Sequence, residues 1–351
     1  MSSASNQNRT RTLEKILWPR FILFPVLAIA AYPFFIMGIG GETWYVQTGW
    51  VLFLTYCWFC VGGAFHETVH ETLFKNGAIN RWYGRVLGWM VGIPYTVYRE
   101  SHRRHHAYLN TPDDYELWPY SDPSTSLWFR RSFLWIDLLF GVVTAPHIYG
   151  RIFLNNDPRL SKKVRRTILL EYLALLVYWA LALSVIFYFL KKPDGTYHKF
   201  QWIWILPLVL SPMVNTARKF VEHLGMQSTN PVLGTRTVVS NNWIESWLGY
   251  FNFDIAIHGP HHRYPKARHY ELEAKLVDCI EKHPEEQVPV FSSYLTAFID
   301  SAKCFWNAPQ TGSHLSGHTT QVHSESVEAQ NWESNEVLMQ ESSMDDHETH
   351  Q

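Results

Sequence analysis

The stretch YVQTGWVLFLTYCWFCVGGAFHETVH (residues 45–70) joins a charge-free apolar run, 45–65, directly to the pentapeptide HETVH. An apolar helix of this length is sufficient to cross roughly 30 Å of hydrocarbon. His66 and His70 are four residues apart, so a helix places both on one face. The stretch therefore predicts a membrane span that brings two imidazoles to one point at the membrane surface.

Three further stretches have the same apolar character and the same length range. The stretch 168–190 holds a single acid, Glu171. The stretch 202–217 contains Pro207 and Pro212, which are typical of a kinked helix. We therefore predict an all-α integral membrane protein with four transmembrane helices and a cytoplasmic, histidine-rich helical cap. The predicted spans are 21–40, 45–65, 168–190 and 202–217.

Two weaker apolar stretches, 86–98 and 133–149, are too short or too mixed to span a bilayer. We expect half-inserted or interfacial helices there. The first span could instead be a signal peptide cleaved after Ala28-Ile29-Ala30. The apolar run continues past that point, which favours an uncleaved span.

The distribution of basic residues gives the orientation. With four spans, all but three of the 30 Lys and Arg residues fall in the segments 1–20, 66–167 and 218–351. Cytoplasmic segments carry the excess of Lys and Arg, so these segments, both termini included, are predicted to be cytoplasmic. The basic residues alone predict this orientation, and it puts every histidine cluster on the cytoplasmic side.

Two more clusters follow the first: HRRHH at 102–106 and HGPHH at 258–262. Spacings of three and four residues again put the imidazoles of each cluster on one helix face. Neutral imidazole is a good ligand for iron, zinc, copper and nickel and a poor one for magnesium or calcium. The clusters therefore predict a transition-metal site, with eight candidate ligands: His66, His70, His102, His105, His106, His258, His261 and His262.

Composition excludes some other functions. A net charge of −1 gives no indication of nucleic-acid binding. The four cysteines, Cys57, Cys60, Cys279 and Cys304, form neither a zinc ribbon nor a disulfide framework. The mean hydropathy of −0.14 is low only because a polar tail, 307–351, dilutes the apolar part. We expect a cytoplasmic segment 1–20, a membrane domain 21–306 and a disordered tail.

The three histidine boxes resemble those of the membrane fatty acid desaturase family, which includes related hydroxylases and ketolases. The resemblance covers about residues 20–290. It includes Arg263-Tyr264-Pro265 after the third box, the segment 110–114 (NTPDD) and Glu222-His223. It implies a ninth ligand, His223, and a non-haem di-iron centre that activates O2 and removes hydrogen from an unactivated C–H bond. Gly259 and Pro260 of the third box stand where many relatives have other residues, so the resemblance does not identify the substrate or the position of attack.

The number of imidazoles agrees with that implication. Nine ligands are too many for one metal, which usually takes four to six donors, but they suit two irons. Two irons can together deliver electrons to dioxygen, whereas zinc has no redox chemistry. The expected cofactors are two irons with O2 as co-substrate, and the expected substrate is an apolar chain lying between the spans.

Side chains around the boxes are expected to support the ligands, because a ligating imidazole usually donates its other N–H to a carboxylate or carbonyl. Each of these acids could instead be a helix cap or a surface charge. Asn215 is expected to approach the metals through a water. The acidic candidates are Glu67, Glu71, Glu100, Asp113, Asp114, Glu222 and Asp254.

Basic residues near the boxes could bind a substrate head group or anchor the protein at the membrane surface. Arg218 and Lys219, one turn before His223, are the best head-group candidates. The others are Arg99, Arg103, Arg104 and Arg236. The isolated histidines His147, His198, His269 and His283 are not expected to be ligands.

The reaction is predicted to be desaturation of a fatty acid or acyl lipid. Hydroxylation, ketolation or oxidative decarboxylation to a terminal alkene could begin from the same hydrogen abstraction. The sequence shows no haem, iron–sulfur or dinucleotide motif. Electrons would therefore come from a separate ferredoxin, rubredoxin or cytochrome b5. Small size favours the bacterial inner membrane and leaves the endoplasmic reticulum open.

Two other functions are compatible with parts of the sequence. HETVH also matches the zinc metalloprotease motif His-Glu-x-x-His, which would suggest an intramembrane protease but leaves the other six box histidines unexplained. A metal carrier or sensor is the second. Transporters place ligands near the bilayer midplane, whereas these histidines lie at one surface.

Overall fold

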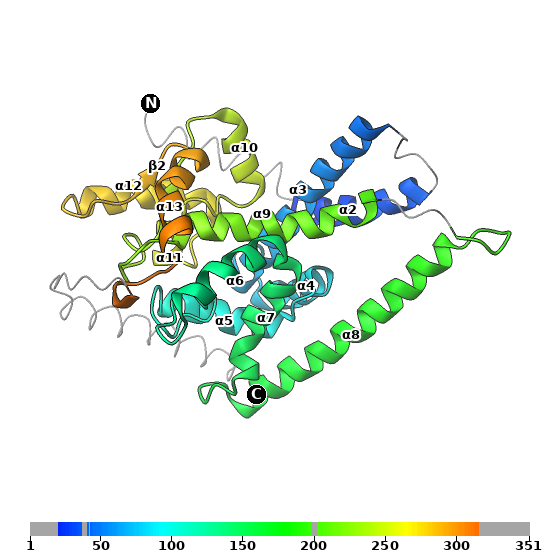
Figure 1. The fold of residues 1–351 in the computed structure, drawn as a ribbon, viewed down its shortest axis with the longest axis horizontal. Coiled ribbons are helices and arrows are strands. Elements are labelled where there is room, and N and C mark those ends of the chain that lie inside the picture. Colours follow the sequence, from blue (N-terminus) through cyan, green and yellow to red (C-terminus); the bar gives the residue numbers. More distant parts are fainter. Residues whose placement is uncertain (1–19, 37–40, 42, 198–201, 316–351) are drawn as a thin grey trace.

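A computed structural model describes residues 20–36, 41, 43–197 and 202–315. The regular structure of this part of the chain is mostly helical, with one short parallel pair of strands and one isolated β-bridge between Lys191 and Tyr197 (Figure 1). The elements are α2 Arg20–Ile36, α3 Trp44–Val69, α4 Gly77–Val91, α5 Tyr95–Ala107, α6 Leu127–Leu139, α7 Gly141–Leu154, α8 Lys162–Leu190, η1 Trp202–Trp204, α9 Leu206–His223, β1 Thr237–Val238, α10 Trp243–Phe251, α11 His258–Arg263, η2 His269–Glu271, α12 Leu272–Lys282, β2 Val290–Phe291, α13 Tyr294–Asn307 and η3 Ser313–Leu315.

Two helices among the described residues are long and apolar enough to cross a membrane, α3 and α8. A third span results if the pair α6 and α7, bent by 119° at its break, is taken as one. The predicted span 21–40 is observed as the 17-residue α2, which is shorter, and residues 37–40 lie outside the described part. The predicted span 202–217 is observed as η1 followed by α9, which continues to His223.

The two predicted interfacial helices are each divided in two. Residues 86–98 fall on α4 and α5, which are separated by Gly92, Ile93 and Pro94. Gly92 ends α4 in the left-handed conformation, at φ 76°, and Pro94 precedes the first residue of α5. Residues 133–149 are divided at Phe140, where the prediction of one helix is wrong. Just after the break, Gly141 packs closely on α9: a Cβ there would lie 3.0 Å from Thr216 Oγ1 and 3.1 Å from Pro212 O.

Helix α3 lies at the centre of the described fold. It packs against α2, α4 and α9, and α9 in turn packs against α6, α7 and α13. Helix α8 is peripheral: it contacts α4 and α5, and its apolar segment is unburied, as expected for a helix that faces lipid (Figure 1). The C-terminal end of α3, which carries His66, therefore lies inside the helical bundle.

The polar segment from residue 307 is ordered further than its composition predicts. Gly225 N donates to Gln310 O (2.8 Å), Thr311 N to Tyr120 O (2.9 Å) and Gly312 N to Met226 O (2.9 Å). These backbone bonds attach residues 310–312 to the loops that follow α9 and precede α6. Composition does not reveal them, because they require no apolar side chain. The remainder of the predicted tail, 316–351, lies outside the described residues.

Candidate metal centre

Four elements bring nine histidines to one place. Helix α3 and its C-cap residue supply His66 and His70, and α9 ends at His223. The short helices α5 and α11 each supply three, spaced so that they share a face. Eight of the nine are buried and His106 is partly buried. The structure thus brings together every histidine that the sequence predicts as a ligand.

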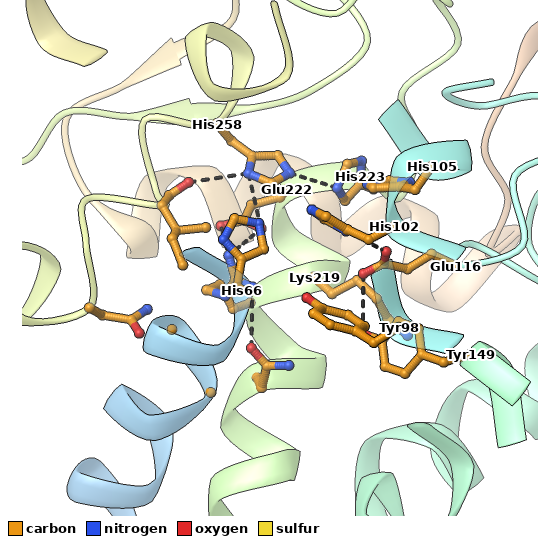
Figure 2. A pocket seen from close by; sticks show the side chains of 16 residues that line it. His66, Tyr98, His102, His105, Glu116, Tyr149, Lys219, Glu222, His223 and His258 are labelled. Atoms are coloured by element: carbon orange, nitrogen blue, oxygen red, sulfur yellow. Dashed lines mark hydrogen bonds and ion pairs between the residues drawn. The ribbon is translucent and has the colours of Figure 1, made fainter. Parts of the chain in front are cut away.

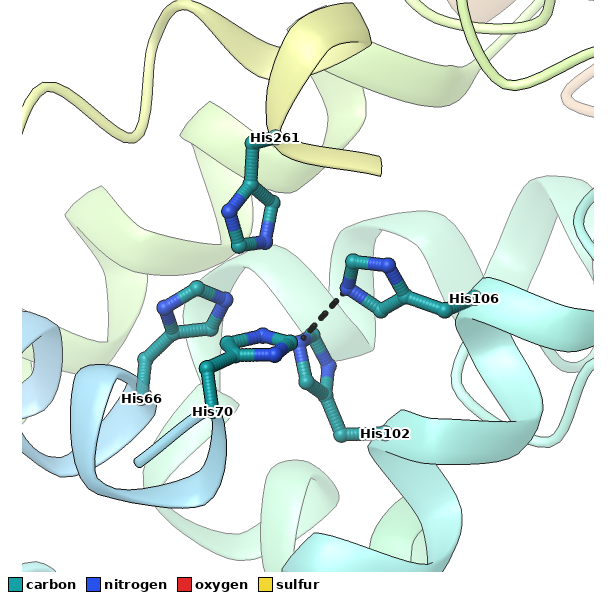
Figure 3. A group of neighbouring side chains, drawn as sticks. All are labelled: His66, His70, His102, His106 and His261. Atoms are coloured by element: carbon teal, nitrogen blue, oxygen red, sulfur yellow. Dashed lines mark hydrogen bonds between the residues drawn. The ribbon is translucent and has the colours of Figure 1, made fainter. Parts of the chain in front are cut away.

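The imidazoles divide into two groups, each with ligand atoms within 4.8 Å of one another. The five-histidine group contains His66, His70, His102, His106 and His261 (Figure 3). The four-histidine group contains His105, His223, His258 and His262. The groups are adjacent, because the rings of His106 and His262 are stacked with centroids 4.2 Å apart.

The facing ring nitrogens have the spacing of ligands on a shared ion. In the five-histidine group, His102 Nε2 lies 3.0 Å from His70 Nε2 and 3.1 Å from His106 Nε2. In the four-histidine group, His258 Nε2 lies 2.7 Å from His223 Nε2 and 3.1 Å from His262 Nε2. Two nitrogens bound about 2.1 Å from one ion at a right angle would be about 3 Å apart. The residues therefore fit a metal in each group.

The other ring nitrogens show which tautomer is present. His102 Nδ1 lies 2.8 Å from Glu116 Oε2, and His105 Nδ1 lies 2.9 Å from Asp114 Oδ2. His258 Nδ1 lies 3.1 Å from the carbonyl oxygen of Ile255. Ionised carboxylates and carbonyls only accept hydrogen bonds, so Nδ1 donates in each case. In the neutral ring this leaves the Nε2 lone pair for a metal.

Burial favours the neutral, metal-binding form of four histidines of the second and third boxes. It lowers the pKa of His106, His258, His261 and His262 well below the ordinary 6.5, and the charges of neighbouring histidines lower it further. Neutral imidazole is the form that binds a metal. These four histidines therefore present lone pairs rather than positive charges to an incoming cation, whereas, against the effect of burial, Asp114 and Glu116 raise the pKa of His105.

Several predicted carboxylates lie beside the histidines. Asp114 accepts from His105, as described above. Glu67 Oε1 is 3.3 Å from His66 Nδ1, and Glu222 Oε2 is 3.6 Å from His258 Nδ1. Asp254 accepts instead from His269 Nδ1 at 2.8 Å.

The remaining predicted acids have cationic partners elsewhere. Glu71 pairs with Arg81, and Asp113 pairs with Arg159 on the surface. Glu100 pairs with Arg99, Arg103 and Arg104 of its own helix.

One supporting carboxylate, Glu116, was not among the sequence candidates. It accepts from His102 Nδ1 and, through Oε1, from the hydroxyl of Tyr149 at 3.1 Å. It follows Asp114 by two residues, so the acid-rich segment after the second box was the available signal. A cis peptide bond between Trp118 and Pro119 follows shortly after Glu116. The sequence does not predict the conformation of this segment.

The predicted head-group cations both line the cavity beside the histidines, and both already have anionic partners. Arg218 Nη1 donates to Glu222 Oε2 at 3.0 Å, and Arg218 Nη2 donates to Asn215 Oδ1 at 3.2 Å. Lys219 Nζ donates to Asp137 Oδ2 at 2.9 Å. Arg236 is directed away, to Asp300 and to backbone carbonyls. His147, His269 and His283 belong to neither histidine group, and His198 lies outside the described residues.

The cavity lies against both histidine groups (Figure 2). His66 and His102 of the five-histidine group and His105, His223 and His258 of the four-histidine group form one wall. The other lining residues come from α3, α5, the segment between α5 and α6, α7, α9 and the turn after α10. Residues of these walls are Gly62, Gly63, Tyr98, Glu116, Tyr149, Asn215, Arg218, Lys219, Glu222, Asn252 and Ile255. A small group held in this cavity would lie beside histidines of both groups.

Glu116→Leu is expected to lower metal affinity and turnover by about 10- to 100-fold, the usual cost of removing the hydrogen-bond partner of a ligating histidine. Metal content at limiting iron and the initial rate would measure this. Glu100→Leu, in which the lost carboxylate pairs with arginines rather than histidine, is the matched control. Equal metal affinity in the two variants would contradict the role of Glu116.

Comparison with known proteins places these features in a family. The fatty acid desaturase family model matches residues 42–294, which include all three boxes and His223. The chain is 24% identical to sphingolipid delta(4)-desaturase DES1 of Homo sapiens over 271 residues, 72% of each chain. It is 25% identical to the Xenopus tropicalis protein of that name over the same length. It is 24% identical to the chloroplastic omega-3 fatty acid desaturase of Ricinus communis over 292 residues, 76% of this chain and 58% of the relative.

Proposed function

Because the chain belongs to the fatty acid desaturase family, and is thus a desaturase-type oxidoreductase, we propose that it introduces a C=C bond into a fatty acyl chain with two non-haem irons and O2. The observation that carries this proposal is the pair of histidine groups against a single cavity. The relatives named above support a lipid substrate. The metalloprotease interpretation of HETVH is set aside, because His66 and His70 share their group with histidines of the other two boxes.

Two irons, when bound, supply the electrons that reduce dioxygen and the oxidising power that removes hydrogen from an unactivated C–H bond. The protein supplies position. Glu116, Asp114 and the carbonyl of Ile255 orient the rings of His102, His105 and His258. The walls of the cavity would hold a short part of the chain beside histidines of both groups, so that the reacting carbons are already in place when the reaction begins.

The electron balance requires a partner. Reduction of O2 to two waters takes four electrons, and formation of one double bond provides two of them with two hydrogens. The other two must come from a separate donor, for which a ferredoxin, a rubredoxin and cytochrome b5 are the candidates. The described residues contain no cysteine set for an iron–sulfur cluster, which is compatible with an external donor.

A second candidate reaction uses the same site on a free fatty acid. Arg218 is a largely buried guanidinium that lines the cavity beside His223 and His258. A carboxylate bound near it would bring the first carbons of the chain to the histidines. Oxidative decarboxylation to a terminal alkene, or hydroxylation, would then compete with desaturation.

Product analysis distinguishes these reactions. Cells that express the chain are fed fatty acids of several lengths, and their lipids are analysed by mass spectrometry with and without O2. An internal double bond formed only with O2 supports desaturation. A chain shortened by one carbon with a terminal alkene, or an added oxygen, would assign the second reaction. Conversion that proceeds equally without O2 would contradict both.

We also propose that α2, α3, α8 and the first part of α9 form the four spans, with the histidines and both termini on the cytoplasmic side of a bacterial inner membrane or of the endoplasmic reticulum. Reporter fusions after residues 41 and 195 would locate those loops. Both reporters are expected to be active only on the side opposite to the histidines. A cytoplasmic location of either loop would contradict this topology.

The cavity predicts a strong effect of Gly62→Leu. A Cβ at Gly62 would meet no atom within 4 Å, and Gly62 lines the cavity one turn before His66, so a leucine side chain would enter the space for substrate. Turnover is expected to fall at least tenfold at unchanged iron content. Gly49→Leu is the matched control, because Gly49 lies on α3 with equally open surroundings but outside the cavity. Equal turnover in the two variants would contradict the assignment of the cavity to substrate.

A further inference from the structure

Asn252 is a buried amide that lines the cavity and has an unsatisfied hydrogen-bond acceptor. It is the C-cap of α10 and one of the residues that line the cavity. No donor among the described residues reaches its Oδ1. Only 6% of the residue is exposed. Buried polar atoms without a partner are rare in folded proteins, and each one destabilises the fold. The position of Asn252 against a substrate cavity suggests that a ligand satisfies it.

The packing around Asn252 is specific to a glycine on α3. A Cβ at Gly63 would lie 2.2 Å from Asn252 Oδ1, so only glycine lets the amide come this close to the helix. Gly63 precedes His66 by three residues, which places the amide about one turn from a histidine of the five-histidine group. Phe253 and Asp254, which follow, both have positive φ, at 61° and 46°. The turn thus holds Asn252 in place at the start of the connection to the third box.

Arg218 provides a second unsatisfied atom in the same cavity. Its two Nη atoms donate to Glu222 and Asn215, but Nε is buried without a partner among the described residues. Two residues of the cavity lining, Arg218 and Asn252, therefore each carry a buried polar atom without a partner among the described residues. A plain hydrocarbon segment could satisfy neither.

We propose that Asn252 and Arg218 bind an oxygen-bearing polar group of the substrate, such as a carboxyl, hydroxyl or amide, close to the carbons that react. This inference rests on the proposed function, because it concerns the substrate of the same site. The oxygen accepts from Arg218 Nε, and a hydroxyl or amide hydrogen is donated to Asn252 Oδ1. Because histidines of both groups form the adjacent wall, the carbons a few bonds away lie beside them.

This arrangement makes the polar end the reference point of the reaction. The site of attack is then at a constant number of bonds from the polar group, whatever the length of the chain. Substrates that differ only in chain length are expected to give products altered at the same position counted from the polar end. Products altered at a constant position counted from the methyl end would overturn the proposal.

Binding measurements test the two residues without turnover. The full chain, purified with its metals in detergent and without reductant, is titrated with palmitic acid, hexadecanol, palmitamide and hexadecane. Each dissociation constant is obtained from thermal shifts. The wild type is expected to bind at least one of the three polar lipids more tightly than hexadecane. Asn252→Leu is expected to weaken that binding roughly tenfold, the effect of one buried hydrogen bond, and to leave hexadecane unchanged.

Two further variants make the result interpretable. Asn241→Leu is the matched control, because Asn241 is exposed and only its backbone forms a hydrogen bond in the structure. Asn252→Ser keeps an acceptor and is expected to recover part of the preference, which a merely structural defect would not show. Equal affinity of the wild type for hexadecane and all polar lipids, or an unaltered preference in Asn252→Leu, would overturn the proposal. A preference that depends on Asn252 in a chain without O2-dependent activity would instead contradict only the proposed function.

Discussion

His102→Ala is expected to lower turnover more than about 100-fold and to empty the five-histidine group of metal. Its Nε2 lies within about 3 Å of the ligand atoms of both His70 and His106, so His102 is at the centre of that group. Loss of only an outer hydrogen-bond partner already costs about 10- to 100-fold, and loss of the ligand itself costs more. Metal content per chain and O2-dependent product formation measure the effect.

The same change in the four-histidine group should act on the other metal. His223→Ala removes the ligand atom 2.7 Å from His258 Nε2 and is expected to lower the iron content from about two to about one per chain. His283→Ala is the matched control, since His283 lies outside both groups and pairs with Glu285 at the surface. Full activity in His102→Ala or His223→Ala would remove that residue from the site.

Removal of the metals is expected to destabilise the folded protein. Four pairs of facing Nε2 atoms lie 2.7–3.1 Å apart in a buried site, so their lone pairs would repel one another if no cation lay between them. A ligand present at about a thousand times its Kd stabilises the native state by about 4 kcal/mol. With about 2–4 °C per kcal/mol for proteins of moderate size, the apparent Tm should fall by roughly 10 °C.

A chelator titration followed by differential scanning fluorimetry in detergent would measure this change. Iron(II) added back without oxygen should restore the original Tm, whereas magnesium should not, because imidazole is a poor ligand for it. An apparent Tm that is identical before and after the metals are removed would show that the nine histidines pack stably on their own.

The histidines could be predicted because their geometry is local. Spacings of three and four residues define a helix face wherever the helix begins, so His102, His105 and His106 converge whatever the exact bounds of α5. The resemblance to the desaturase family is confirmed by the family model. The division into five and four required the structure, because His105 and His106, adjacent in the sequence, belong to different groups.

The supporting residues were harder to predict because they depend on turns. Asp114 and Glu116 both contact histidines, whereas Asp113, in the same segment, points to Arg159 at the surface. Which of three nearby acids faces inward depends on the conformation of the loop, and composition carries little information about it. Asn252 was missed for the same reason, since its position follows from a turn with two positive φ values.

The spans were predicted where hydrophobicity alone determines the helix. The predicted span 168–190 lies within α8, Lys162–Leu190, and the predicted span 45–65 lies within α3. Helix breaks were predicted less well. Gly92 and Pro94 were visible signals for the end of α4, but the bend at Phe140 coincides with a close approach of Gly141 to α9, a contact between distant parts of the chain.

Metal analysis of the purified full chain, combined with X-ray absorption at the iron edge, tests whether the nine imidazoles hold two irons. We expect about two irons per chain, with nitrogen neighbours at imidazole distance and an iron–iron pair. A single zinc per chain, or iron bound mainly by oxygen ligands, would contradict it.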